Sequence, residues 1–369
     1  MHLLDCPINH IAEIAVFSTG GGYGESCVVH LGNQKWMVID SCKDPKTGLV
    51  LPLDYLNEIG VNIEKDLVMI VCTHWHDDHI RGISEILSIA KSSEFCFARA
   101  TDLRKFLTIV KMDYVKAPND PTISSTIEFN KCLHICESRG SQIKYAQSDR
   151  TLLNFNIDKL HTEVISLSPS DLTSEEFDKE LSTLFISCKN NIKIETKTPN
   201  DRSIVLYFKF NNVSALLGAD LGVSDNKKAG WYNILNYCVT RDSKSSFYKV
   251  AHHGSRNSHH IRIWDELLDK NPIACLTPWN RKTKLPENEM LKELCKLSTD
   301  IYMTIPNPND KPKKRERQVE KLINDLNKSV KEAKYERGMI RFRIDMTDPN
   351  PTWEIALLEN AVHVNALNL

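Results

Sequence analysis

The segment His74-Trp75-His76-Asp77-Asp78-His79 directly follows an apolar run, DLVMIVC, at 66–72. Imidazole and carboxylate groups fill five of its six positions, a donor set that suits zinc, manganese or iron better than calcium or magnesium. On a loop at the end of a buried strand, His74 and His76 can aim two imidazoles at one ion. Asp78 and His79 can serve a second ion nearby. A chance cluster of solvated residues is the alternative, and the density of donors disfavours it.

The bulk composition is that of an ordinary globular protein. The chain has 369 residues, of which 41% are hydrophobic and 26% are charged, enough to bury a sizeable core. The formal net charge of −1 provides no global field that would recruit nucleic acid or a membrane. Any preference for a charged partner must therefore come from local patches.

Cysteine usage and targeting signals favour a cytoplasmic protein. The 11 cysteines form no CxxC pair and no secreted-type framework, and several lie in apolar runs, as reduced buried thiols do. No segment resembles a signal peptide, and no apolar run reaches membrane-spanning length. We therefore expect a cytoplasmic localisation and no membrane partner.

Strand and helix patterns alternate along the chain. Strand-like runs lie both in hairpins and between helices, which predicts an α/β sandwich with mixed sheets rather than a purely parallel sheet. The stretch 100–160 lacks a clean period and is expected to be an insertion or cap. The segment 311–337 has the pattern of a basic amphipathic helix, either a phosphate-contacting patch or, as we favour, a solvated face packed on its own core. No linker or repeat marks a second domain, so we expect one domain over 1–369.

Two later strand ends carry further ligand-type residues. Asp220 ends the apolar run ALLGAD, and His252 and His253 follow the run YKVA. One carboxylate can bridge two ions while it balances their charge. Because three strand ends each deliver such residues, we expect them to meet in one dinuclear site. Asp40 ends another strand and is well placed to orient a metal-bound histidine.

The order of these residues resembles the metallo-β-lactamase superfamily of metal-dependent hydrolases over about residues 10–306. The phrases GYGESCVVHLGNQKWMVIDSC, NDRSIVLYFKFNNVSALLGAD and KVAHHGSRNS look most like the hydrolase domain of competence-type (ComEC-like) DNA-uptake proteins and their stand-alone relatives. The resemblance implies an αββα sandwich with the metals at the sheet edge. It leaves 307–369 as a C-terminal helix-strand extension.

The resemblance also implies a ligand set. One ion would be held by His74 and His76, and the other by Asp78, His79 and His252, with Asp220 between them. Asp78 would also orient the attacking water, and His253 would donate to substrate or leaving group. The residues expected to support the ligands or contact substrate are Asp40, Asn200, Ser203, Lys249, Ser255 and Arg256.

One departure from the superfamily concerns the first ion. Most members supply a third histidine between the HxHxDH motif and the bridging aspartate. This chain has only His134 and His161 in that interval, and neither has the usual neighbours. We expect two divalent ions, zinc as the first choice and manganese as the alternative, with the first site the weaker.

The predicted function is a phosphodiesterase or nuclease that acts on nucleic acid or nucleotides through a metal-activated water. The substrate class rests on the resemblance, and a basic neighbourhood of Lys249, Arg256, Lys282 and Lys284 favours an anionic substrate. The resemblance also leaves room for a protein partner encoded nearby. The alternatives are a hydrolase of another ester or amide, such as a lactone, thioester or lactam, and a metal-stabilised binding module with little catalysis.

Overall fold

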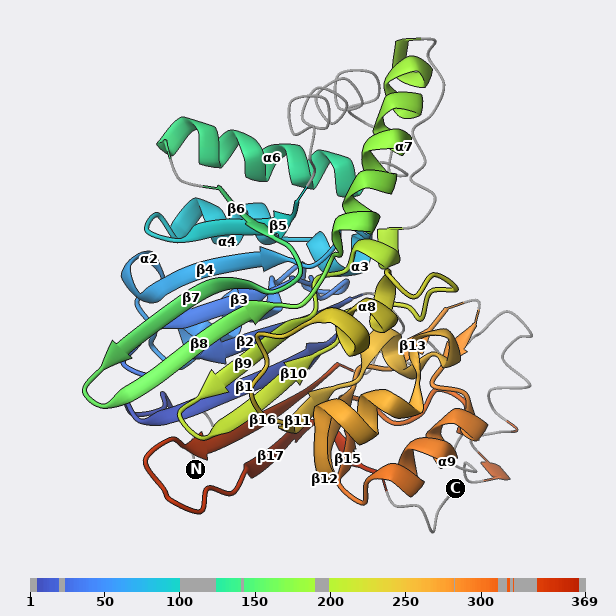
Figure 1. Ribbon diagram of the computed structural model, residues 1–369. Coiled ribbons are helices and arrows are strands. Elements are labelled where there is room, and N and C mark those ends of the chain that lie inside the picture. The colour runs from blue at the N-terminus through green and yellow to red at the C-terminus, as the bar shows by residue number, and fades with distance from the viewer. Residues whose placement is uncertain are drawn as a thin grey trace.

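The computed structural model describes residues 5–19, 24–99, 124–140, 143–189, 199–281, 283–310, 317–318, 321 and 337–364. Within these residues, two eight-stranded sheets form the centre of the molecule (Figure 1). The predicted α/β class with mixed sheets is confirmed.

The first sheet is antiparallel from β17 to β3 and parallel from β3 to β6. Between β2 and β3, Gly32 and Asn33 have φ values of +87° and +49°, which suits a tight turn. In spatial order the strands are β17 (Glu354–Glu359), β16 (Gly338–Asp345), β1 (Ile11–Ser18), β2 (Glu25–His30), β3 (Trp36–Ile39), β4 (Leu67–Cys72), β5 (Glu94–Ala98) and β6 (Ile143–Ala146).

The second sheet is parallel from β10 to β15 and antiparallel outside that range. In spatial order its strands are β18 (Val362–His363), β15 (Ile301–Met303), β12 (Leu268–Leu276), β11 (Ser245–Lys249), β10 (Val213–Leu217), β9 (Leu206–Phe210), β8 (Leu160–Ser166) and β7 (Arg150–Ile157). A separate small hairpin joins β13 (Trp279–Asn280) to β14 (Lys284–Leu285). Each sheet thus contains a parallel half, and parallel strands end at a common edge.

Helices cover the outer faces of the sandwich. The first sheet packs against α1 (Leu51–Glu58), α4 (Ile83–Ile89) and α6 (Ser124–Arg139), and the second against α8 (Gly230–Tyr237) and α9 (Asn288–Leu297). The other α-helices are α2 (Ile63–Asp66), α3 (Asp77–Ile80) and α7 (Asp171–Lys189). None of the helices in the described ranges is long and apolar enough to cross a membrane.

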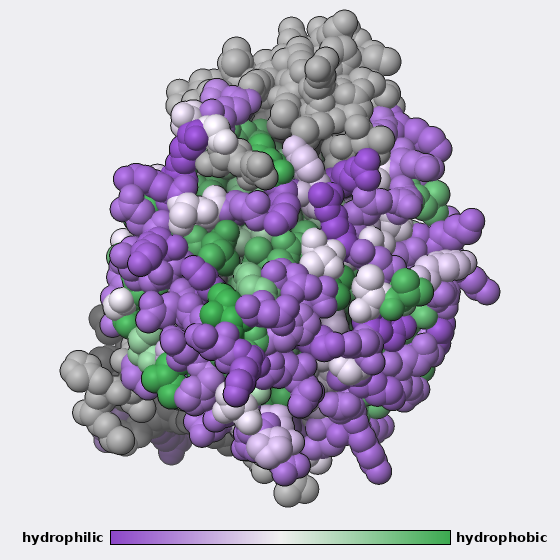
Figure 2. All heavy atoms as spheres, turned by 60° about the vertical axis from the view of Figure 1, so that its left-hand side comes forward, coloured by the Kyte–Doolittle hydropathy of each residue, from purple (hydrophilic) through white to green (hydrophobic). Residues whose placement is uncertain are grey.

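Side-chain alternation along the strands builds the core between the sheets. On β1, Ala12, Ile14 and Val16 face the second sheet, while Ala15 and Phe17 face the helices, as a period of two requires. Hydrophilic side chains cover most of the face in Figure 2, and hydrophobic ones are exposed there in small groups between them.

Two regions predicted to lie outside the core contribute strands to the sheets. In 100–160, α6 covers the first sheet, and β6 and β7 form the last strand of each sheet. In 307–369, β16 lies between β1 and β17, and β18 joins the second sheet. Most of the basic helix over 311–337 lies outside the described residues. The division into core, insertion and extension stays a prediction.

Phe208 tests the core between the sheets. Its side chain is fully buried and its ring stacks on Phe210 with centroids 5.7 Å apart. We expect Phe208→Ala to lower the free energy of unfolding by about 3–5 kcal/mol, because the cavity it leaves cannot close completely. Urea unfolding followed by circular dichroism measures the change. Leu357→Ala on β17, where the side chain is 42% exposed, is the control and should shift the value by less than about 1 kcal/mol. Equal effects would contradict the buried position of Phe208.

Candidate metal centre

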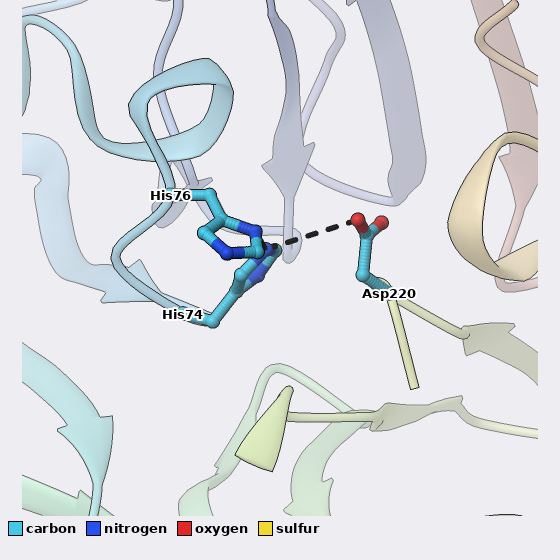
Figure 3. Close-up of side chains that lie close together, drawn as sticks. All are labelled: His74, His76 and Asp220. Atoms are coloured by element: carbon cyan, nitrogen blue, oxygen red, sulfur yellow. Dashed lines mark hydrogen bonds and ion pairs between the residues drawn. The ribbon is translucent and has the colours of Figure 1, made fainter. Parts of the chain in front are cut away.

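The predicted ligand residues come together where strands of the two sheets end. The loop after β4 carries His74 and His76, and α3 carries Asp78 and His79. The turn after β10 carries Asp220, and the turn after β11 carries the histidine pair. The amide of His252 donates to the carbonyl of Ala219 at 2.8 Å, which holds the last two turns side by side. Figure 3 shows His74 and His76 facing Asp220 from a different part of the chain.

The first group consists of His74, His76 and Asp220, whose ligand atoms all lie within 4.8 Å of one another. The Nε2 atom of His74 is 3.8 Å from Asp220 Oδ2 and 3.1 Å from His76 Nδ1. Burial lowers the pKa of His74 well below its ordinary value, and the neighbouring His79 lowers it further. Two neutral ring nitrogens that face each other so closely suit a shared cation.

The second group consists of Asp78, His79 and His253. Asp78 Oδ2 lies 3.5 Å from His79 Nε2 and 3.8 Å from His253 Nε2. Asp220 stands between the two groups, because its Oδ2 is 3.6 Å from His79 Nε2 and 4.0 Å from both His252 Nε2 and His253 Nε2. One carboxylate thus lies close to ring nitrogens of both groups.

Two observations show that a cation fits this arrangement. His79 Nε2 and Asp220 Oδ1 are buried without a hydrogen-bond partner among the described residues, and buried polar atoms normally have one. Burial disfavours a charged His79, but Asp220, Asp78 and Asp40 raise the pKa of that ring well above its ordinary value. The three carboxylates therefore stabilise a positive charge at His79 Nε2. A divalent ion bound there would supply that charge in place of a proton on the ring.

Asp40 fixes the orientation of His79. It accepts hydrogen bonds from the amide and the hydroxyl of Thr73 at 2.7 and 2.6 Å, and His79 Nδ1 donates to it at 2.7 Å. This contact places the ring proton on Nδ1 and turns Nε2 toward Asp78 and Asp220. A hydrogen bond of this kind orients a metal-bound histidine in many metal sites, and the supporting role of Asp40 stays a prediction.

The histidine pair sits in a turn of unusual backbone. His252, His253 and Gly254 have φ values of +48°, +55° and +75°, a region that side-chain-bearing residues rarely adopt. His253 Nδ1 donates to the carbonyl of Thr277 at 2.7 Å, which leaves Nε2 facing the carboxylates. His252 Nε2 lies 3.3 Å from Asn200 Nδ2 as well as near Asp220. Both rings reach Asp220, and the group of close ligand atoms contains His253 rather than the predicted His252.

Lys249 was predicted to support the ligands or to contact substrate. Its Nζ is buried and donates to both carboxylate oxygens of Glu25, at 3.1 and 3.0 Å. Burial opposes the charge, but Glu25 raises the pKa of Lys249 above its ordinary value, so the amine stays protonated. The pair joins β2 of the first sheet to β11 of the second. The charge of Lys249 is therefore paired inside the protein, beside His253, which suits support of the ligands better than contact with substrate.

Glu25 is the residue that sequence reasoning missed. It accepts a hydrogen bond from the hydroxyl of Thr277 and lies 3.4 Å from His253 Nδ1. It also forms a third group of close ligand atoms with His79 and Asp220. The sequence indicated that a buried acidic partner exists, because Lys249 lies in the strand FYKVA and a buried charge needs a partner. It did not indicate which acidic residue that partner is.

Some of the other residues predicted to support ligands or contact substrate line a cavity, and others do not. Asn200, Ser255 and Arg256 line a cavity of about 650 Å³ that opens over the two ligand groups, and Arg256 Nη1 lies 3.3 Å from Glu293 Oε1. Ser203 is fully buried, and its carbonyl accepts a hydrogen bond from the hydroxyl of Ser168. Lys284 donates to the carbonyl of Pro308, and Lys282 lies outside the described residues.

Neither intervening histidine completes the first group. His134 on α6 is 61% exposed and lies 3.8 Å from Glu137. His161 belongs to β8 and its amide donates to Asn211, in the turn between β9 and β10. That turn lies at the opposite end of β10 from Asp220. The group around His74 and His76 thus has Asp220 as its third member.

Comparisons with known proteins concern the fold. No protein-family model matches the chain, and no curated protein matches it. The chain is similar to the metallo-β-lactamase fold protein YhfI from Bacillus subtilis, with a TM-score of 0.29 and 12% identity over 58% of this chain and 65% of that one. Similarity to the hydrolase AbOPH of the β-lactamase superfamily has a TM-score of 0.35 and 13% identity, over 61% and 76%.

A third similar structure is AidC, described as a dizinc quorum-quenching lactonase, with a TM-score of 0.30 and 12% identity over 53% of this chain and 55% of that one. The chain thus spans less than two thirds of the length of YhfI and of AidC. At these identities the similarities identify no activity or substrate for this chain.

Asp40 provides a test of metal binding apart from catalysis. The variant Asp40→Asn keeps the shape of the side chain but removes the charge that holds His79. We expect zinc or manganese affinity to fall by about 10–100-fold, measured by competition with a chromogenic chelator. Asp242→Asn, at an exposed pair with Lys209, is the control and should bind as the wild type does. Unchanged affinity in Asp40→Asn would show that Asp40 does not orient a ligand.

The buried ion pair provides a test of stability. Lys249→Met removes the ammonium group that balances the buried charge of Glu25, and we expect it to lower the free energy of unfolding by about 3–5 kcal/mol. The double variant Glu25→Gln/Lys249→Met removes both charges and should recover part of that loss. Chemical denaturation measures both. Glu266→Gln at the exposed pair with Arg262 is the control, with an effect below about 1 kcal/mol. A loss no larger than this control would refute the buried pair.

Proposed function

We propose that the protein is a metal-dependent hydrolase that cleaves phosphodiester bonds in nucleic acid or nucleotides. The observation that supports it most is the position of Asp220, whose carboxylate lies within 4.0 Å of ring nitrogens of His74, His79, His252 and His253. Asp220 also lines the cavity above the ligand groups. A buried carboxylate among imidazoles, open to a cavity, suits hydrolysis better than a purely structural metal site, whose coordination is closed.

Metal ions would be held by two sets of residues. His74, His76 and Asp220 would hold one ion, and Asp78, His79 and His253 the other, with His252 also in reach of Asp220. When bound, two divalent ions supply Lewis acidity that makes water nucleophilic near neutral pH and offsets charge on phosphoryl oxygens. Zinc is the first choice for this donor set, and manganese is the alternative.

Asp78 is the residue placed to handle the proton of the attacking water. It lines the cavity, and its side chain is 14% exposed. Burial alone would raise the pKa of this carboxyl, but His79 and His253 hold it well below its ordinary value. The carboxylate therefore stays ionised at neutral pH, and it can accept a hydrogen bond from water and fix its direction of attack.

The two adjacent histidines exchange the roles that the sequence suggested. His253 is 5% exposed and turned toward the carboxylates, which suits a ligand. His252 is 21% exposed and lines the cavity, which suits contact with the leaving group. Asn200 lies 3.3 Å from His252 Nε2 and can hold that ring in place.

The choice of a phosphodiester rests on the resemblance to competence-type hydrolases and on polar groups at the cavity wall. Asn200, Ser255 and Arg256 line it and can donate hydrogen bonds to phosphoryl oxygens. The cavity volume of about 650 Å³ accommodates a nucleotide-sized group. Lys249 adds nothing to this choice, because its charge is paired with Glu25.

Two substitutions test the proposed chemistry. In protein loaded with zinc or manganese, we expect Asp78→Asn and Asp220→Asn to lower kcat/KM for bis-(p-nitrophenyl) phosphate by at least about 100-fold, because each removes a carboxylate that acts on water or on both ions. Elemental analysis separates the two, since Asp220→Asn should lower the content of both ions, whereas Asp78→Asn should lower the content of one. Asp242→Asn is the surface control with wild-type activity. Full activity in both site variants would contradict the mechanism.

A substrate panel tests the substrate class. It contains single-stranded DNA, RNA and cyclic nucleotides, together with a lactone, a thioester and a chromogenic lactam, each with zinc or manganese. Cleavage restricted to the phosphodiesters supports the proposal. Turnover of a lactone, thioester or lactam alone would replace the substrate class, and two tightly bound metals without any turnover would replace hydrolysis by a binding function.

A further inference from the structure

The geometry points to a subsite beside the metal centre in which the indole of Trp279 stacks on a nucleobase of the substrate. This inference rests on the proposed function, because it names the part of a nucleotide that lies next to the scissile phosphate. It rests on three features of the cavity wall: the placement of Trp279, the charges around it and its contact with His253.

Trp279 is held in place by its neighbours. It belongs to the small hairpin of β13 and β14, in which it pairs with Leu285. Its ring packs nearly parallel to the ring of His253, with centroids 5.3 Å apart and an angle of 27° between the planes. His253 is itself fixed by Thr277. The indole therefore has a defined orientation before any substrate binds, which lowers the entropic cost of stacking.

Trp279 also remains open to the cavity. Its side chain is half-buried and lines the cavity together with Thr283 and Leu285. The ring is separated from Asp78 by only one residue, because His253 stacks on the indole and its Nε2 lies 3.8 Å from Asp78 Oδ2. A planar group against Trp279 would thus lie near a phosphate at the metal centre.

Charged groups of both signs lie near Trp279, and a nucleobase carries no charge that either sign would repel. The guanidinium of Arg281 lies 5.8 Å from the indole centroid, within the range of a cation–π contact, and Arg and Trp together form stacking sites for bases. Glu287 lines the same cavity, and a carboxylate there would repel a further phosphate group. An uncharged nucleobase satisfies both conditions.

A pair of phosphodiesters with the same charge and leaving group tests the subsite. Thymidine 5′-(p-nitrophenyl phosphate) carries a base, and methyl p-nitrophenyl phosphate does not. We expect the wild type to have a KM about 10-fold lower for the thymidine ester, the size of one base–aromatic stack. Trp279→Ala should abolish this preference, and Trp279→Phe should keep most of it. Trp353→Ala, on a tryptophan that donates to Ser246, is the control and should leave the preference unchanged.

The same experiment separates stacking from mere support of His253. If Trp279 only supports that ring, Trp279→Ala lowers kcat for both esters equally and keeps the KM ratio, which would overturn the inference. If the metal-loaded wild type hydrolyses neither ester, the proposed function fails. Calorimetric titration then tests the subsite by measuring the dissociation constants of thymidine monophosphate and methyl phosphate. Tighter binding of thymidine monophosphate that disappears in Trp279→Ala upholds it, and equal binding of the two ligands overturns it.

Discussion

The buried carboxylate of Asp220 is the constraint on which the rest of this structure depends. Its side chain is 3% exposed, and an isolated charge at such a position would be strongly unfavourable. Burial works to raise the pKa of Asp220, yet His79, His253 and His74 hold it well below its ordinary value. Those imidazoles come from both sheets, so the strand ends must converge on one point. The candidate metal centre therefore forms where both sheets provide imidazoles that stabilise the buried charge of Asp220.

Two further polar contacts keep that convergence in place. Asp40, at the end of β3, binds Thr73 and His79 next to the end of β4, which fixes the first sheet at this edge. Glu25 on β2 and Lys249 on β11 form an ion pair between the sheets. A buried pair contributes little net stability compared with apolar packing, but a broken one is costly. A shift of one sheet against the other would break this pair and leave both charges buried, which would be costly.

The residues that the sequence could identify are those at the ends of apolar runs. Asp40, His74, Asp220 and the histidine pair follow strands whose hydrophobic pattern is unambiguous, so their convergence was predictable. The pairing of Glu25 with Lys249 was not, because 224 positions separate them and strand order is not a local property. The place of β16 was not predictable either, since it lies beside β1, far away in the sequence. Nothing in the local pattern of GMIRFRIDM specifies that neighbour.

The orientations of His252 and His253 could not be predicted from the sequence either. Their positive φ values turn His253 inward, where Thr277 holds its Nδ1, Glu25 lies beside it and Trp279 packs against its face. One imidazole thus contacts the carboxylates of the metal centre, the ion pair between the sheets and the wall of the cavity. Because interiors are closely packed, a change at the wall displaces the ring that the centre uses. Recognition of substrate and geometry of the metal centre are therefore coupled through His253.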